Sequence, residues 1–508
     1  PVAKETTIKW LLAWGHKNGF TFYQVDYHGA FLHSVIPEEF QVHIKTPRGT
    51  EIGEGKVLRC VKGLYGLKNA GHLWIKDLTK SLLSMGFEES TADQSLFLLK
   101  KDREIACAIA VWVDDLMVAC RDTKFIDKFV KEVEDQGFVL SSIGDLEFFL
   151  GMKIEFHEDG TVIVSQRAYI EDMLTRFGFQ ANGKHNPLSP DKTLSHRNMP
   201  EPESKEWTIE NVECTFEVRQ AVGALYHLAR WSLPEILFAV NHISQFQTKS
   251  KAQCWPRICD VMAYVLANKT ATQTFGKKET PMIMFVDANF GGCARHQGTS
   301  GKPPSLEDIE RMDEAKAKAE FIKWMERDIR KKTHHIEDVK SQYGYVCFFY
   351  GGPGSYRSKK ITTITQSSTE AEIHGLNEAI RECKYLLKLC DDFGVTPNNG
   401  KMTPTSADPE CAVARRDPMI IFEDNNGAKA TAEKRQTTQR NKQIAIREFW
   451  CAEQVLDRWV TIESVQSTLN VADIMTKPLH EPTFKKLRGW LRGTDWPEAG
   501  SGPHVCFD

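Results

Sequence analysis

Two aspartates stand side by side between apolar residues, Asp114 and Asp115 in the stretch VWVDDLMVA. The residues on either side, 105–113 and 116–120, are typical of β-strands, so we expect the pair in the turn of a hairpin. Asp26 ends another apolar-aromatic stretch and could supply a third carboxylate. Carboxylates held at strand ends can bind two divalent ions about 4 Å apart, the arrangement used for phosphoryl transfer. Taken alone, each acid has a simpler interpretation as a turn or helix-cap residue.

The C-terminal half contains four more acids at the ends of predicted elements. Two of them end apolar stretches that predict strands, residues 282–286 and 419–422, and two lie near predicted helix starts. If they converge, they could hold metal ions that activate water for hydrolysis of a phosphodiester. Individually, the two near helix starts could simply favour the helix dipole or cap a helix. The four are Asp287, Glu370, Asp424 and Asp473.

Helical periodicity and turn residues predict the elements that would position these acids. Thr369 with Glu372 matches a capping box, apolar residues then recur at helical spacing up to residue 390, and Gly394 fits a helix end. A strand is expected over residues 343–350, and residues 181–212, rich in proline and polar side chains, are expected to be irregular. Further helices are expected over residues 6–20, 73–85, 122–137, 167–178, 216–231, 234–247 and 252–268.

Composition indicates a globular chain of several domains. It has 508 residues, of which 41% are hydrophobic and 26% charged, with a formal net charge of −3, so any nucleic-acid surface must be local. Thirteen cysteines without a Cys-x-x-Cys pair argue against zinc and a disulfide framework, and favour a reducing compartment. No apolar run approaches the roughly 20 residues of a membrane span. Because the chain starts at Pro1, we expect it to be part of a longer polyprotein.

Six motifs follow one another in the first 270 residues: QVDYHGAFLHSVIPEEFQVHIKTP (24–47), KGLYGLKNAGHLW (62–74), WVDD (112–115), GDLEFFLGMKI (144–154), SQRAYIEDML (165–174) and RQAVGALYHLARWSLPEILFAVNHISQF (219–246). In this order they resemble the motifs of the reverse transcriptases of copia-type retrotransposons. This resemblance implies that Asp26, Asp114 and Asp115 are metal ligands. It also implies that Trp112, which stands where the family usually has Tyr, lies at the primer end. Gly66 and Lys68 would contact the incoming nucleotide or the template. In the family, a basic fingers segment precedes the position of Pro1.

Four stretches follow in the C-terminal half, FVDANFGG, YGYVCFFYGGPGSYRSKKITTITQSSTEAE, FEDNNGAKA and NVADIMTKPL. They resemble the ribonuclease H domain of the same elements. The resemblance implies that Asp287, Glu370, Asp424 and Asp473 are metal ligands. The chain departs from the family at Gln443-Ile444-Ala445, where His-Ile-Asp is usual. A charged insertion at about residues 296–340 is also unusually long for a connection in a compact domain, and we expect it to be a peripheral helical excursion.

The resemblance implies an α+β fold, a right-hand polymerase palm and thumb followed by an α/β ribonuclease-H-like domain. The expected domains are a palm over 1–180, a thumb or connection over 181–275, a ribonuclease-H-like domain over 276–480 that is complete by itself, and a tail over 481–508. The implied cofactor is Mg²⁺ or Mn²⁺. The implied partners are an RNA or DNA template, a primer, an RNA–DNA hybrid and deoxynucleoside triphosphates, with no membrane. The implied location is a virus-like particle in the cytoplasm, or the nucleus.

Two alternatives to a reverse transcriptase with ribonuclease H activity stay open. One is a degenerate or domesticated product of such an element that binds nucleic acid without polymerising. The other is a chain that keeps only nuclease activity. A metal-dependent primer-extension assay separates these hypotheses.

Overall fold

The structure is a computed structural model that describes residues 2–47, 49, 55–276, 281–292, 337–397, 417–433 and 445–492. Residues 296–336, which make up most of the expected insertion, lie outside this part. So do Gln443 and Ile444, where the sequence departs from the family pattern. Within the described residues, no helix is both long and apolar enough to cross a membrane.

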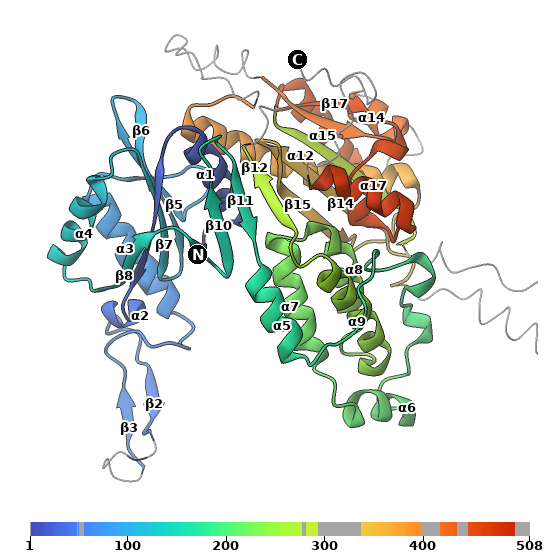
Figure 1. The fold of residues 1–508 in the computed structure, drawn as a ribbon, viewed down its shortest axis with the longest axis horizontal. Helices are drawn as coiled ribbons and strands as arrows, with labels where there is room; N and C mark the ends of the chain where they lie inside the picture. The colour runs from blue at the N-terminus through green and yellow to red at the C-terminus, as the bar shows by residue number, and fades with distance from the viewer. Residues whose placement is uncertain are drawn as a thin grey trace, which may run out of the picture.

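A six-stranded sheet forms the first unit (Figure 1), with strand order β4-β5-β6-β7-β1-β8. Side chains along its strands alternate between two cores. Phe97, Ile109 and Val118 pack with the helices α3 (Ala70–Ser84) and α4 (Phe125–Asp135), whereas Leu98 and Ala108 face the core that contains α1 (Glu5–Lys17). The strands are β1 (Thr21–Tyr27), β4 (Glu88–Glu89), β5 (Leu96–Lys101), β6 (Glu104–Trp112), β7 (Asp115–Cys120) and β8 (Leu140–Asp145).

Two small sheets extend this unit. A hairpin of β2 (His43–Lys45) and β3 (Val57–Arg59) projects from it (Figure 1), next to the short helix α2 (Ala30–His33). A four-stranded sheet of order β12-β11-β10-β9 leads toward the second half of the chain. Its strands are β9 (Phe148–Phe149), β10 (Met152–Phe156), β11 (Val162–Ser165) and β12 (Thr272–Phe275).

A helical region connects the two halves. Its apolar residues share one core with one face of the second large sheet. The helices are α5 (Arg167–Arg176), α6 (Lys205–Thr208), α7 (Val218–Trp231), α8 (Leu237–Ser244) and α9 (Lys251–Ala267). The helices expected over 216–231, 234–247 and 252–268 are therefore confirmed.

The second large sheet has five strands in the order β15-β14-β13-β16-β17. Strands β13 to β15 pair antiparallel, whereas β16 pairs parallel with both β13 and β17. Helix α12 packs on one face, and α8 and α16 contact the other, which gives three layers. The strands are β13 (Ile283–Asn289), β14 (Gln342–Phe349), β15 (Gly352–Lys360), β16 (Met419–Glu423) and β17 (Val460–Ser464). The helices are α12 (Ser368–Phe393), α14 (Asn426–Glu433), α15 (Ala445–Leu456), α16 (Asp473–Thr476) and α17 (Glu481–Leu491).

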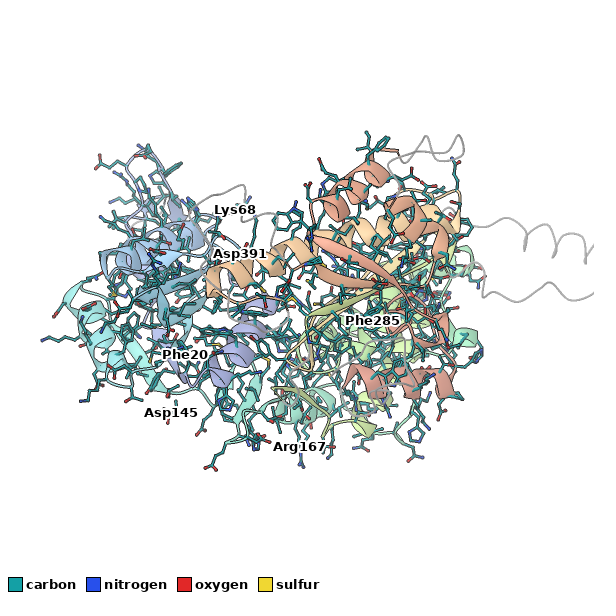
Figure 2. All side chains as sticks on the ribbon, turned by 90° about the horizontal axis from the view of Figure 1, so that it is seen from above. Phe20, Lys68, Asp145, Arg167, Phe285 and Asp391 are labelled. Atoms are coloured by element: carbon teal, nitrogen blue, oxygen red, sulfur yellow. The ribbon has the colours of Figure 1, made fainter. Side chains whose placement is uncertain are left out.

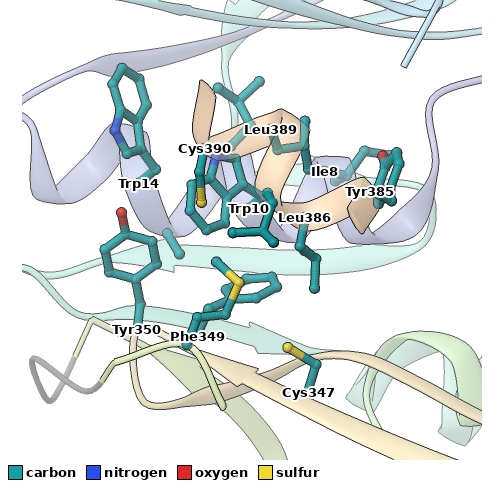
Figure 3. Packing of buried hydrophobic residues seen from close by; sticks show 14 of the residues in the cluster. Ile8, Trp10, Trp14, Cys347, Phe349, Tyr350, Tyr385, Leu386, Leu389 and Cys390 are labelled. Atoms are coloured by element: carbon teal, nitrogen blue, oxygen red, sulfur yellow. The ribbon is translucent and has the colours of Figure 1, made fainter. Parts of the chain in front are cut away.

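Helix α1 lies between the two large sheets, and its buried face joins them into one core (Figure 3). Trp10 is fully buried and contacts Phe349 and Tyr350, while Trp14 packs edge-on to Phe393 at the end of α12. Phe20, at the start of the first sheet, belongs to this same core, whereas Phe285 of the second sheet faces the helical region (Figure 2). The two units are therefore not separated by solvent at α1.

The expected C-terminal boundary at residue 480 does not match the structure. Residues 481–491 form α17, and its side chains Phe484, Leu487 and Trp490 are buried in the core of the helical region and second sheet. The apolar residues at 484, 487, 490 and 491 are spaced as in a helix, so the sequence does carry a signal for α17.

Candidate active sites

The first acidic site is built where β1 meets the β6–β7 hairpin. Asp26 lies directly opposite Asp115 in the antiparallel register of β1 and β7, and Asp114 lies in the turn before β7. The turn is tight, since Val113 takes a left-handed φ of 61°, and the Trp74 indole donates a 2.6 Å hydrogen bond to the Val113 carbonyl. The structure thus brings the three predicted aspartates to one end of the sheet, but their carboxylate oxygens do not all lie within 4.8 Å of one another.

Polar side chains hold each of these carboxylates. The Ser141 hydroxyl donates to Asp26, the Tyr65 hydroxyl donates to Asp114 over 3.3 Å, and the Gln24 amide donates to Asp115 over 3.4 Å. Burial raises the pKa of Asp115, and the nearby charges of Asp26 and Asp114 raise it further. This mutual repulsion indicates a site that would gain from a bound cation.

Trp112, Gly66 and Lys68 lie at different places around this site. Trp112 is paired with Asp115 in the hairpin, but its ring packs edge-on to Trp231 of α7, 6.1 Å away. Gly66 has a φ of 97°, a conformation that favours glycine, in the turn that carries Tyr65 to Asp114. Lys68 is exposed two residues later.

The second acidic site lies near the carboxyl ends of two parallel strands. Phe285 of β13 pairs with Phe422 of β16, so Asp287 and Asp424 both lie two residues further along. Asp473 is the first residue of α16, which packs on β13 and β14. Ligand oxygens of Asp287, Asp424 and Asp473 all lie within 4.8 Å of one another. The structure therefore brings together three of the four predicted acids of this half.

A lysine and a threonine that sequence reasoning missed complete this cluster. Lys477 places its Nζ 2.5 Å from Asp473 and 3.9 Å from Asp287, and the Thr476 hydroxyl donates to Asp287. Burial, followed by the charge of Asp287, raises the pKa of Asp473 to about 8, although the Lys477 ammonium acts in the opposite direction. Both residues follow Asp473 within one turn, and that spacing was a signal in the sequence.

Glu370, the fourth predicted acid, does not join the cluster. Its backbone N–H donates to the Ser367 hydroxyl over 3.1 Å, and its carboxylate accepts from the Gln366 N–H over 2.6 Å. This is a capping box at the start of α12, and it lies two residues before the expected pair of Thr369 and Glu372.

Glu372 faces the site in place of Glu370. It is buried, and its carboxylate groups with those of Glu423 and Asp424 within 4.8 Å. Burial raises the pKa of Glu372 well above its usual range, followed by the charges of Glu423 and Asp287. The sequence carries a signal for Glu372 in its helical spacing. Glu372 lies four residues before the core residue Leu376 and therefore on the buried face of α12.

Comparison with known proteins finds a family match over the part of the chain that contains the first site. Residues 1–190 match the family model described as reverse transcriptase (RNA-dependent DNA polymerase). The retrovirus-related Pol polyprotein from transposon RE2 of Arabidopsis thaliana is 26% identical over 493 residues, 96% of this chain and 28% of that relative. The one from transposon TNT 1-94 of Nicotiana tabacum is 22% identical over 489 residues, 96% of this chain and 32% of that relative.

The chain is a relative of copia-type retrotransposon Pol polyproteins, with a reverse transcriptase domain. It spans about a third or less of the length of these Pol relatives. Among solved structures, the foamy viral protease-reverse transcriptase in complex with dsDNA aligns with 88% of this chain and 68% of that chain. The sequence identity is 12% and the TM-score 0.21, a similarity too low to support an argument about the fold.

In this Pol relative, a cleft of about 760 Å³ lies where α1, β6, α7, α8 and β15 meet. Trp112 lines it, and the exposed side chains of Arg357 and Lys359 lie on the β15 side. Two acids, Glu5 and Glu382, also line it, and Glu5 forms an ion pair with Arg230. The basic residues along its walls are Lys4, Arg230, Arg357, Lys359 and Lys360.

Proposed function

We propose that this chain polymerises DNA on an RNA or DNA template and cleaves the RNA strand of RNA–DNA hybrids. The reverse transcriptase domain and the three carboxylates at the β6–β7 hairpin support the polymerase activity. One observation carries the nuclease activity. Asp287 lies near the carboxyl end of β13, Asp424 directly follows the parallel strand β16, and the carboxylates of Asp473 and Glu372 group with them.

The donors at both sites fit a divalent metal ion with oxygen ligands, Mg²⁺ or Mn²⁺. Asp26, Asp114 and Asp115 would hold it at the first site, and Asp287, Glu372, Asp424 and Asp473 at the second. Such ions, when bound, supply charge stabilisation and an activated oxygen nucleophile. Burial first, and then the charges of neighbouring carboxylates, raise the pKa of Asp115 and of Asp473, which fits carboxylates that a bound cation would stabilise.

The chain's own residues orient these carboxylates. Thr476 and Lys477 fix Asp287 and Asp473, and the Asn470 amide donates a 2.8 Å hydrogen bond to the Val286 carbonyl beside Asp287. At the first site Ser141, Tyr65 and Gln24 do the same for the three aspartates. We propose that the basic walls of the cleft contact the phosphates of the primer and template, an interaction that does not depend on sequence.

Two assays on the full chain test the proposal. Hybrid cleavage is followed with a labelled RNA strand annealed to DNA, and primer extension with deoxynucleoside triphosphates, each with Mg²⁺ or Mn²⁺. Asp424→Asn should abolish cleavage, while Asp457→Asn, an exposed aspartate after α15, should leave it unchanged. Cleavage that survives in purified Asp424→Asn protein would overturn the nuclease assignment.

The same assays distinguish the two alternatives. Hybrid cleavage without primer extension would identify a chain that keeps only nuclease activity. Nucleic-acid binding with neither reaction would identify a degenerate or domesticated binding protein.

A further inference from the structure

Two sets of carboxylates lie next to each other in the second unit and share Asp424. The first set is Asp287, Asp424 and Asp473, and the second is Glu372, Glu423 and Asp424. Glu423 is the last residue of β16 and is not among the four acids predicted for this site. Both sets are largely buried, and in the second set Glu372 is 5% exposed and Glu423 is 0% exposed.

The second set has buried oxygens without partners. One oxygen of Glu423 accepts a 2.9 Å hydrogen bond from the Asn425 N–H, but its Oε2 has no hydrogen-bond partner. Oε2 of Glu372 is buried and without a partner in the same way. An unpartnered carboxylate oxygen in the protein interior is costly, so binding of a ligand to these two oxygens would be favoured.

Charge distinguishes the two sets. Lys477 forms ion pairs with Asp287 and Asp473 of the first set. Within the described part of the chain, no lysine, arginine or histidine forms an ion pair with Glu372 or Glu423. Three carboxylates that lie within 4.8 Å of one another, two of them buried, therefore face no ion-paired cation of the protein. A multivalent cation would satisfy both the charge and the free oxygens.

We propose that Glu372, Glu423 and Asp424 form a divalent-cation subsite in which Glu423 is an additional ligand. The donors are all carboxylate oxygens, which favours Mg²⁺ or Mn²⁺ over metals that prefer nitrogen or sulfur. Asp424 belongs to both sets and would bridge this subsite to the first one. The cation-binding claim rests on geometry, whereas its use in RNA cleavage rests on the proposed function.

Binding of Mn²⁺ to the full chain tests this subsite. Titration calorimetry and Mn²⁺ electron paramagnetic resonance count the bound ions, in an Asp115→Asn background that weakens the site at the β6–β7 hairpin. We expect two ions on the second unit, and we expect Glu423→Gln to remove one or to weaken it by at least about 10-fold. The matched control is Glu463→Gln, an exposed glutamate in register with Phe422 on the neighbouring strand β17.

Thermal unfolding gives a second measurement that does not depend on activity. Without metal, Glu423→Gln should unfold at a higher temperature than the parent, because a neutral amide replaces a carboxyl group whose charge the buried position disfavours. Addition of Mn²⁺ should raise the unfolding temperature of Glu423→Gln by less than it raises that of the parent. If Glu423→Gln does not fold, Glu423→Met, which keeps the length of the side chain without its oxygens, replaces it in both measurements.

The outcomes separate this subsite from the nuclease proposal. Equal Mn²⁺ stoichiometry and affinity in the parent and in folded Glu423→Gln would overturn the subsite, even if hybrid cleavage is found. If Mn²⁺ binding is equal but the difference in unfolding free energy between the parent and Glu423→Gln changes with pH, a proton shared by Glu372 and Glu423 would explain the site instead. Two bound ions that depend on Glu423, in a chain that does not cleave hybrids, would support the subsite and overturn the nuclease.

Discussion

The indole ring of Trp10 lies edge-on to the ring of Phe349, with their centroids 5.3 Å apart and their planes at 74°. Trp10 belongs to α1, which precedes the first sheet, and Phe349 belongs to β14 of the second sheet. Both side chains are fully buried. The contact means that the second unit takes part of its core from the N-terminal end of the chain.

Trp10→Ala should therefore destabilise both units together. Truncation of a fully buried aromatic side chain typically costs about 3–5 kcal/mol, part of it from the cavity that remains. Urea unfolding of the full chain measures the loss, with Leu83→Ala as a control because Leu83 is 47% exposed. If Trp10→Ala and Leu83→Ala lose equal free energy of unfolding, the contact between Trp10 and Phe349 contributes little to stability.

A fragment of residues 276–480 should aggregate or fail to fold, contrary to the expectation of a complete domain. It lacks α1, which covers Phe349 and Tyr350, and α17, which buries Trp490 beside the helical region. Large exposed apolar patches favour association. Size-exclusion chromatography and circular dichroism of the fragment check this, and a monomeric, folded fragment would contradict it.

Asp114→Asn and Asp115→Asn should each abolish nucleotide incorporation. Each variant removes one of the three carboxylates at the β6–β7 end of the sheet, and loss of one such electrostatic group typically costs about 3–4 kcal/mol of transition-state stabilisation. Primer extension measures the loss, and hybrid cleavage by the same preparations should persist. Asp135→Asn, at the exposed end of α4, is the control. Normal incorporation by either site variant would exclude that residue from the polymerase site.

Glu370 and Glu372 should respond differently to the same change. Glu370→Gln keeps a capping side chain, so its effect on unfolding should be below about 1 kcal/mol and hybrid cleavage should continue. Glu372→Gln removes a buried carboxylate from the acidic cluster and should abolish cleavage. The two variants are compared in one cleavage assay. Loss of cleavage in Glu370→Gln but not in Glu372→Gln would show that Glu370 is the ligand.

Acid should destabilise the helical region through His242. This side chain is buried, and its Nε2 accepts a 2.9 Å hydrogen bond from the Leu194 N–H. Burial, together with the charge of Lys360, lowers its pKa from 6.5 to about 3, while Asp338 acts in the opposite direction.

The direction of this effect follows from proton uptake. As the pH falls below 6.5, the unfolded chain binds a proton at His242 that the folded chain does not bind. The stability contribution is present above pH 6.5 and is lost toward pH 3, by at most about 1.4 kcal/mol per pH unit. His242→Gln, which keeps an acceptor but cannot titrate, should have a smaller slope of unfolding free energy against pH from 6.5 to 4. An unchanged slope would show that other groups dominate.

The sequence by itself determined the local elements and most of the acids. Alternating apolar residues predicted β6 and β7 around Asp114 and Asp115, and helical spacing ending at Gly394 predicted α12. These features depend on periodicity and turn residues close together in the chain, which is why they could be read without the fold. The order of the acidic motifs also predicted the relationship to copia-type Pol polyproteins.

The tertiary structure decided which acids meet. Whether Glu370 or Glu372 faces Asp424 depends on where α12 begins and on its rotation against β13 and β16, and a capping box two residues earlier than expected changes the answer. Glu423 looks like an ordinary strand residue until the fold leaves its oxygen buried without a partner. The shared core at Trp10 also depends on residues more than 300 positions apart, and periodicity along the chain carries no information about such contacts.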